Sequence, residues 1–269
     1  LSATHRTFLL GADPDGSGNL AQNQFYVSAT VVIGGNPAAN RWVRFTLTES
    51  TGDTVSTTSS TVQTTGSGVA VIGPILFTDG APAGGTVFVF ACVDQNLDST
   101  CDGPANTLTL YFLSEPAAPL NVAVVSDCNE SGQISDNCVP QVGPHPSGQP
   151  AGKDATLTLT LDGPASTGPQ LPVVAVITDA SPPTGTTANA SFTTCPASGD
   201  GTDVQAKSTS FDGTHHTAQW DLYVCGIVND NNDDSFTVAV YWDVDGNNAF
   251  TPGVDQQIGS TQTLTINDN

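Results

Sequence analysis

The stretch 86–112 reads TVFVFACVDQNLDSTCDGPANTLTLYF, and the stretch 236–266 repeats its plan as FTVAVYWDVDGNNAFTPGVDQQIGSTQTLTI. In each, apolar residues alternate with polar ones on both sides of a loop rich in Asp and Asn. Alternation with a period of two is typical of half-buried β-strands, so each stretch predicts a strand, an acidic loop and a second strand. A duplicated module explains this echo more simply than two independent origins.

The same alternation recurs along the whole chain, and no stretch carries a helical apolar stripe. The 27 Gly and 18 Pro residues separate the apolar runs with turn chemistry. We predict strands over residues 25–33, 42–48, 69–77, 86–92, 107–113, 120–125, 155–161, 172–178, 189–194, 217–225, 236–242 and 261–266. The sequence therefore predicts an all-β protein with two Ig-like β-sandwich domains in tandem.

The two domains are predicted to be joined by the Pro-rich stretch 139–153, VPQVGPHPSGQPAGK, which has almost no large apolar residue and should run extended. Residues 1–20 form an N-terminal strand or tail with an acidic loop. The first sandwich then covers residues 21–138 and the second covers 154–269.

The charge balance is strongly acidic, with 5 Lys and Arg against 26 Asp and Glu and a formal net charge of −21. Such a chain repels nucleic-acid phosphates and anionic lipids, so neither partner is expected. Glu occurs only at Glu49, Glu115 and Glu130, and the Asp residues cluster with Asn and Gly in turns. This distribution favours cation chelation over a generally charged surface.

The acidic loops have the alternate spacing by which short loops supply oxygen ligands to calcium. Turn propensity alone also places Asp, Asn and Gly together, but five such loops make that explanation insufficient for all of them. The predicted calcium ligands are Asp13, Asp15, Ser17 and Asn19; Asp94, Asn96, Asp98 and Asp102; Asp127, Asn129 and Asp136; and Asp243, Asp245, Asn247 and Asp255. Asn229, Asn231 and Asp233 form the fifth set.

The chain has six Cys, begins at Leu1 and contains no Met, features that indicate an exported mature protein in an oxidising compartment. No apolar run is long enough to span a bilayer, so no membrane insertion is expected. Among fifteen possible pairings we favour local disulfides, because two of the pairs bracket acidic loops. The predicted pairs are Cys92 with Cys101, Cys128 with Cys138, and Cys195 with Cys225.

The segments GNPAANRWVRFTLTESTGDTVS (35–56) and TTGSGVAVIGPILF (64–77) resemble the bacterial Ig-like repeats of invasin-type surface proteins. The shared pattern is a Pro-bearing turn before a V-x-F-T strand, followed by T-x-x-x-G-x-A. The resemblance implies an Ig-like sandwich in a microbial cell-surface structural or adhesive protein.

No catalytic motif is present, and the four His residues are interpreted as surface residues, so we expect no enzyme activity. The sequence predicts an extracellular structural subunit, stabilised by calcium and disulfides, that polymerises with copies of itself into a cell-surface filament, fibre or surface layer. The alternative is a calcium-dependent adhesin or carbohydrate-binding module. It would bind surface glycans or other cell-surface proteins through an exposed aromatic such as Trp42 or Trp220.

The N-terminal segment LSATHRTFLL (1–10) is a candidate for assembly through Thr7, Phe8, Leu9 and Leu10. In donor-strand exchange, Thr7 and Leu9 would face one way and Phe8 and Leu10 the other, in the open sheet edge of another subunit. The equal alternative is that the segment pairs within its own first domain.

Overall fold

The computed structural model describes residues 1–10, 24–50, 52–78, 84–116, 120–124, 134–135, 153, 155–179, 189–193, 202–225 and 234–267. Within these ranges the chain forms strands and contains no helix, which confirms the predicted all-β class. The contacts divide the chain into two compact units. Unit 1 comprises Leu1–Ser114 with Asp162–Pro169, and unit 2 comprises Glu115–Leu161 with Gln170–Asn269.

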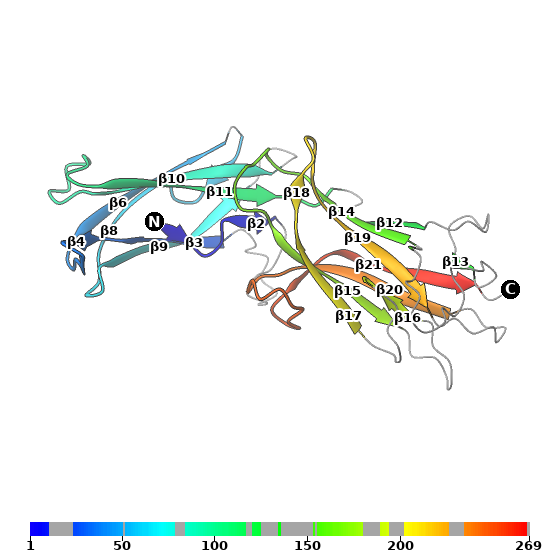
Figure 1. Cartoon of the computed structure of the whole chain (residues 1–269). Helices are drawn as coiled ribbons and strands as arrows, with labels where there is room; N and C mark the ends of the chain where they lie inside the picture. Colours follow the sequence, from blue (N-terminus) through cyan, green and yellow to red (C-terminus); the bar gives the residue numbers. More distant parts are fainter. Residues whose placement is uncertain are drawn as a thin grey trace. The chain divides into compact units, whose positions relative to one another are not determined.

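Unit 1 contains one four-stranded and one five-stranded sheet, with a small hairpin beside them (Figure 1). The four-stranded sheet has the order β1 (Ser2–Ala3), β3 (Gln24–Thr30), β9 (Val69–Thr78), β7 (Thr54–Val55). The five-stranded sheet has the order β2 (Thr7–Leu9), β11 (Ala105–Leu113), β10 (Gly85–Val93), β6 (Trp42–Glu49), β8 (Ser59–Gln63). The hairpin consists of β4 (Val32–Ile33) and β5 (Asn36–Pro37).

Unit 2 is also built from two sheets. One has the order β12 (Leu120–Val124), β14 (Ala155–Leu161), β19 (His216–Cys225), β16 (Asn189–Ser191), with β18 (Ser210–Phe211) also pairing with β19. The other has the order β13 (Ile134–Ser135), β21 (Gln256–Asn267), β20 (Asp234–Trp242), β15 (Pro172–Asp179), β17 (Thr202–Ser208).

The two units share one strand plan. In the sheet of β10 and in that of β20 this central strand forms an antiparallel hairpin with the next strand of the chain. A short parallel strand lies beyond that hairpin, as β2 or β13, and an edge strand closes the other side, as β8 or β17. This correspondence is what the sequence echo between 86–112 and 236–266 predicted.

Aromatic rings from four strands form the core of unit 1. Phe112 of β11 stacks on Phe77 of β9 with a centroid distance of 3.9 Å and on Phe8 of β2 with a distance of 5.0 Å. Phe25 of β3 contacts Phe8 and Phe112 at 5.8 Å. These rings come from both sheets and are at most 2% exposed, so they join the two layers of the sandwich.

The N-terminal segment pairs within its own unit, which is the second of the two arrangements that the sequence left open. β2 runs parallel to β11, with Phe8 opposite Phe112 and Leu9 opposite Leu113. Thr7, Phe8 and Leu9 are all buried, so the expected alternation of facing residues does not hold for this strand. The Thr7 hydroxyl also donates a hydrogen bond to the carbonyl of Pro169.

The strand β12 belongs to unit 2, which differs from the domain prediction. It was expected to complete the first sandwich, yet it pairs with β14 from Leu120 opposite Leu159 to Val124 opposite Ala155. Strand alternation alone does not specify a partner, and β12 forms an edge strand in unit 2. Apart from Lys153, the predicted linker 139–153 lies outside the described residues.

We expect Phe112→Ala to lower the free energy of unfolding by about 3 to 5 kcal/mol, because it removes a buried ring that contacts three others. Urea unfolding followed by circular dichroism measures the change. Leu76→Ala, at a site 39% exposed on β9, is the control and should change stability by less than about 1 kcal/mol. Equal effects of the two substitutions would contradict this account of the core.

Candidate metal centre

Loops with the same backbone plan follow β10 and β20. We count the first Asp of each loop, Asp94 or Asp243, as position one. Positions four and six then have positive φ in both loops. The values are 60° at Leu97 and 69° at Ser99 in unit 1, and 68° at Gly246 and 60° at Asn248 in unit 2. The two loops are therefore one structural motif present twice.

The side-chain hydrogen bonds repeat in the same positions. The backbone amide at position two donates to the side chain of the last Asp of the loop. The amide at position five donates to the side chain at position three, and the amide at position seven donates to the side chain at position five. In unit 1 the bonds are Gln95 N to Asp102 Oδ2 (2.7 Å), Asp98 N to Asn96 Oδ1 (3.2 Å) and Thr100 N to Asp98 Oδ1 (2.8 Å). In unit 2 they are Val244 N to Asp255 Oδ1 (3.1 Å), Asn247 N to Asp245 Oδ1 (3.1 Å) and Ala249 N to Asn247 Oδ1 (2.6 Å).

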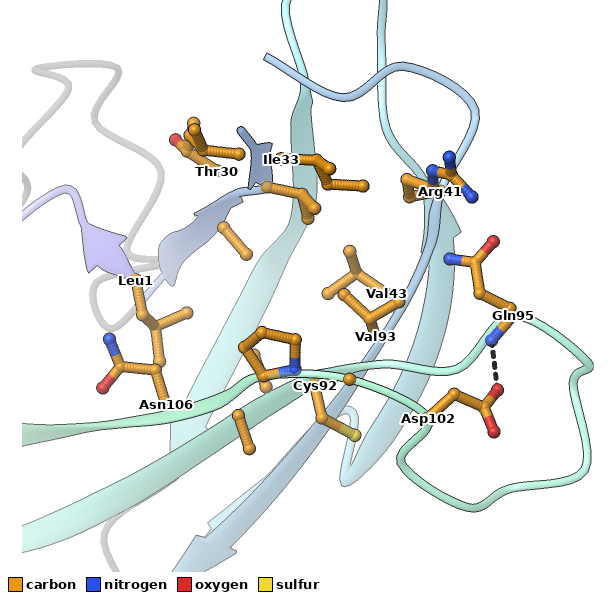
Figure 2. A pocket seen from close by; sticks show the side chains of 17 residues that line it. Leu1, Thr30, Ile33, Arg41, Val43, Cys92, Val93, Gln95, Asp102 and Asn106 are labelled. Atoms are coloured by element: carbon orange, nitrogen blue, oxygen red, sulfur yellow. Dashed lines mark hydrogen bonds between the residues drawn. The ribbon is translucent and has the colours of Figure 1, made fainter. Parts of the chain in front are cut away.

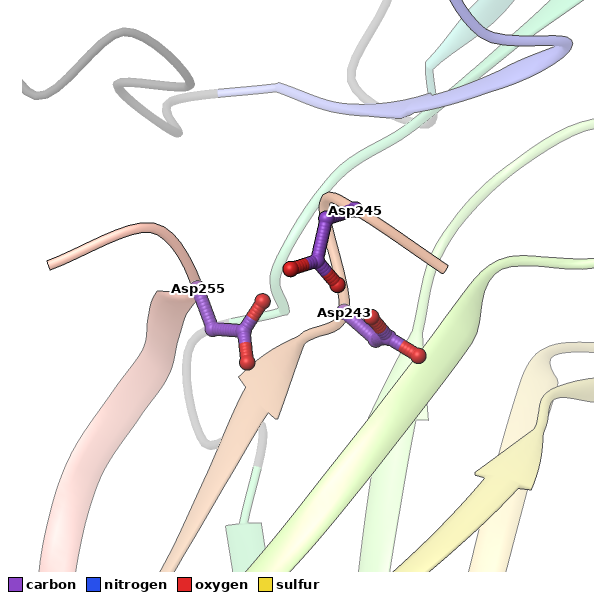
Figure 3. A group of neighbouring side chains, drawn as sticks. All are labelled: Asp243, Asp245 and Asp255. Atoms are coloured by element: carbon purple, nitrogen blue, oxygen red, sulfur yellow. The ribbon is translucent and has the colours of Figure 1, made fainter. Parts of the chain in front are cut away.

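The unit 2 loop brings three carboxylates together. Figure 3 shows Asp243, Asp245 and Asp255 as neighbouring side chains. Each offers an oxygen within 4.8 Å of those of the other two. Asp243 is 1% exposed and Asp255 7% exposed, whereas Asp245 is open to solvent. No other such group of His, Cys, Asp or Glu side chains occurs in the part of the chain that the structure describes. These three residues are the candidate metal centre.

Backbone amides hold the carboxylates in place without exhausting their acceptor capacity. Asp243 accepts the amides of Gly246 at 2.8 Å and Asn248 at 2.9 Å. Asp255 accepts the amide of Thr251 at 2.7 Å in addition to that of position two. Because each carboxylate oxygen has two acceptor sites, a cation can still bind to the same groups. The side-chain nitrogen of Asn247 donates to Asp245 and to the Thr251 hydroxyl, and its role as a calcium ligand stays a prediction.

The electrostatics of the triad favour an added positive charge. Burial raises the pKa of Asp255, and the charges of Asp243 and Asp245 raise it further, against the lowering effect of hydrogen bonds from the Thr251 and Val244 amides. No basic side chain contributes to the shift. Carboxylate oxygens without a protein counter-charge are the ligands that hard cations such as calcium prefer.

The unit 1 loop has a protein cation where the unit 2 loop has none. Arg44 of β6 lies opposite Cys92, two residues before Asp94. The corresponding position in unit 2, opposite Tyr241, is the fully buried Val174. Hydrogen bonds from the Thr100 hydroxyl and amide lower the pKa of Asp98, and the charge of Arg44 lowers it slightly more.

The predicted ligands of the unit 1 loop do not form a carboxylate group like that of unit 2. Asp94 is 1% exposed, and its Oδ1 has no hydrogen-bond partner; the Nε of Arg44 is likewise buried without one. Asp98 and Asp102 point their oxygens at loop amides and lie on the surface. The two loops differ in sequence here: position three is Asn96 in unit 1 and Asp245 in unit 2, so the carboxylates that meet in unit 2 have only Asp94 and Asp102 as carboxylate counterparts in unit 1.

In each unit the residue two places before the first Asp of the loop contacts the residue at position eight, and this contact holds the loop against its strand. In unit 1 the contact is the predicted disulfide between Cys92 and Cys101, which the structure confirms. In unit 2, Tyr241 and Phe250 hold these positions, and their rings lie 4.4 Å apart. A covalent closure in one unit thus corresponds to an aromatic contact in the other.

Several predicted site residues lie outside the described residues. They are Asp13, Asp15, Ser17, Asn19, Asp127, Asn129, Asp136, Asn229, Asn231, Asp233, Cys128, Cys138 and Cys195. The side chain of Cys225 is also outside the description, so the disulfides Cys128–Cys138 and Cys195–Cys225 stay predictions.

Two interpretations of single residues are wrong. Trp220 is fully buried, and its Nε1 donates to the carbonyl of Gln205 at 3.1 Å, so it offers no exposed ring. His216 is 1% exposed rather than on the surface; its Nδ1 lies 3.3 Å from Gln170 Oε1 and its ring contacts Phe211. Both positions belong to β19, where alternation turns them inward.

A cavity of about 520 Å³ opens in unit 1 beside the first acidic loop (Figure 2). Its walls are mainly apolar and include Val31, Val43 and Val93, with Arg41 and Asp102 at the rim. The Asp102 carboxylate already accepts the amide of Gln95, which Figure 2 shows as a dashed line. The cavity has the size of small-molecule sites but brings no set of metal-binding groups together.

No protein family model matches the chain, and no curated protein matches it. No helix in the described residues is long and apolar enough to cross a membrane. Similar solved structures include the collagen adhesin from S. aureus, with 10% identity and a TM-score of 0.22, covering 99% of this chain and 91% of that one. The tip adhesin from Pseudomonas aeruginosa has 8% identity and a TM-score of 0.23, covering 90% of each chain.

The major pilin from Corynebacterium diphtheriae has 12% identity and a TM-score of 0.19, covering 97% of this chain and 64% of that one. Scores of 0.19 to 0.23 do not indicate a shared fold.

We expect Cys92→Ser combined with Cys101→Ser to lower the free energy of unfolding by about 2 to 3 kcal/mol. The disulfide closes a short loop, and opening it restores chain entropy to the unfolded state. Urea unfolding under non-reducing conditions measures the loss. Ser99→Ala in the same loop is the control and should leave stability nearly unchanged. An unaltered midpoint in the double variant would show that the loop contributes no constraint.

Proposed function

We propose that this protein is an extracellular structural subunit of a cell-surface filament, fibre or surface layer, with a calcium ion closing the loop of unit 2. The observation that carries the proposal is the pair of equivalent loops. One is closed by a disulfide and an Arg side chain, and the other gathers three carboxylates without a protein cation.

The disulfide supports a location outside the cytoplasm. Cys101 lies in an exposed loop, where a reducing compartment would keep such a pair open. Two units, each built from a pair of sheets, with their loops closed covalently or by an ion, suit a protein that has to persist in an environment without chaperones.

Calcium is the cation that fits this donor set. Asp243, Asp245 and Asp255 supply only oxygens, and backbone carbonyls and water would complete the six to eight ligands that calcium takes. Sites of this kind outside cells bind in the range of about 0.1 to 1 mM, which matches extracellular calcium rather than cytosolic calcium.

Copies of the same chain are the proposed partners, which makes the protein a polymer subunit. Donor-strand exchange through Thr7, Phe8, Leu9 and Leu10 is not required for one chain to fold, because β2 already completes its own sheet. An exchange would have to expose Phe8, which is 2% exposed in the single chain. Assembly through other surfaces of the units therefore costs less free energy than donor-strand exchange.

We expect Asp245→Asn to remove one bound calcium per chain, because it takes one charge from the triad while leaving the buried Asp243 and Asp255 in place. Isothermal titration of wild type and variant with calcium chloride measures the stoichiometry. Asp98→Asn in the equivalent loop of unit 1 is the matched control and should bind as many ions as wild type. Identical titrations for wild type and Asp245→Asn would rule out a calcium site in this loop.

Bound calcium should also stabilise the fold. At a hundredfold excess of free calcium over Kd, one site adds about 2.7 kcal/mol to the free energy of unfolding. Thermal unfolding with millimolar calcium and with excess EGTA measures the difference. It should shrink in Asp245→Asn and persist in Asp98→Asn.

Polymerisation is tested by electron microscopy of the concentrated protein with calcium and with a chelator. We expect filaments, fibres or sheets in calcium. A strictly monomeric protein under both conditions would contradict the structural role, whereas the calcium titration would stand independently.

A further inference from the structure

The outer face of the five-stranded sheet in unit 1 carries an ordered set of aromatic and hydroxyl side chains. Phe88 of β10 lies between Thr48 of β6 and Thr109 of β11 in the strand register. One step along the strands, Phe90 lies between Thr46 and Thr107. These six residues form two parallel Thr–Phe–Thr rows, and we call them the Phe88 face.

The Phe88 face points to solvent. The residues between its members, including Phe45, Val89 and Leu110, are buried, because successive side chains of a strand point to opposite faces. Phe88 is 53% exposed, Thr48 and Thr107 are exposed, and the other three are half-buried. None of the four Thr hydroxyls has a hydrogen-bond partner among the described residues.

The Phe88 face also lacks the acid that dominates the rest of the protein. The chain has a net charge of −21, yet no Asp or Glu occupies an outward position between Thr46 and Thr48, Thr86 and Phe90, or Thr107 and Tyr111. The charges nearest the face are cationic: Arg44 in the row of Cys92, and Arg6, whose Nε donates to the backbone carbonyl of Thr109 at 3.0 Å. An uncharged partner thus meets no carboxylate on these rows.

We propose that the Phe88 face binds a neutral polysaccharide. Sugar rings have apolar C–H faces that stack on aromatic rings, and their hydroxyls need hydrogen-bond partners around the edge of the ring. Phe88 and Phe90 supply the stacking surface, and the four Thr hydroxyls, each both donor and acceptor, lie on either side of them. The two rows repeat along the strand direction, which suits an extended chain of sugar units.

A second copy of the protein fits this surface less well. Packing two such faces together would bury four hydroxyls from each copy on rigid strands, where each finds a partner only if the two sheets meet in register, and a buried polar group without a hydrogen bond is costly. A polysaccharide brings its own hydroxyls to the contact. The array of free hydroxyls around two rings therefore favours a sugar ligand over a sheet-to-sheet protein contact.

The ends of the Phe88 face have defined borders. At one end the disulfide between Cys92 and Cys101 fastens the acidic loop over the same side of β10, next to the half-buried Trp42. At the other end lie Thr86 and Tyr111, which pair across β10 and β11. The surface is thus confined to the middle of the sheet.

The test is affinity electrophoresis in gels containing soluble neutral polysaccharides, together with pull-down on insoluble cellulose and chitin. Wild type should be retarded or retained by at least one neutral polysaccharide and not by the anionic polysaccharide alginate. Phe88→Ser should weaken the retention by about three- to tenfold, the loss expected for one aromatic stacking contact. Phe88→Tyr, which keeps the ring, should restore it.

Tyr26→Ser is the matched control, because Tyr26 is an aromatic residue 47% exposed on β3 in the other sheet of the same unit. It should bind as wild type does, and all variants should unfold at similar temperatures. The proposal is overturned if no neutral polysaccharide retains the wild type, or if Tyr26→Ser loses as much as Phe88→Ser. It is also overturned if Phe88→Ser reduces self-association in light scattering while leaving polysaccharide binding intact.

Discussion

Repulsion among carboxylates is the constraint around which both units are built. The central hairpin of each five-stranded sheet reverses direction in an acidic loop, so negative charge accumulates at the end of the strand that organises the sheet. Backbone amides bind the carboxylates and fix the loop geometry, but they leave the net charge in place. Each unit therefore needs a further source of positive charge or a covalent closure.

Unit 1 meets this requirement and unit 2 leaves it open, although both keep the same backbone. Unit 1 places Arg44 beside the loop and closes it with Cys92 and Cys101. Unit 2 has Val174 in the place of Arg44, packs Phe250 on Tyr241 and gathers three carboxylates. Duplication followed by divergence at a few contact positions explains how one plan came to have two kinds of closure.

Because the acidic side chains lie mainly in the loops, the outer faces of the strands are free for other roles. Acid in unit 1 is concentrated in the loops, so the middle of the sheet can carry the uncharged rows of Thr and Phe. The structural role of the loops and the binding role of the Phe88 face are therefore compatible within a single unit.

Much of the architecture follows from the sequence alone, because alternation of apolar residues determines which side chains turn inward. It predicted the strands around Phe45, Val89 and Leu157, the acidic loops between them and the pairing of Cys92 with Cys101. It did not predict the edge strands β8 and β17, whose largely exposed residues give no alternating apolar signal. The sequence already distinguishes the two loops, because position three is Asn96 in unit 1 and Asp245 in unit 2. Only the tertiary structure decided that Asp255, far along its loop, folds back to meet Asp243 and Asp245. The residue beside each loop comes from a neighbouring strand, as the cationic Arg44 or the apolar Val174, and the loop sequence carries no information about that neighbour.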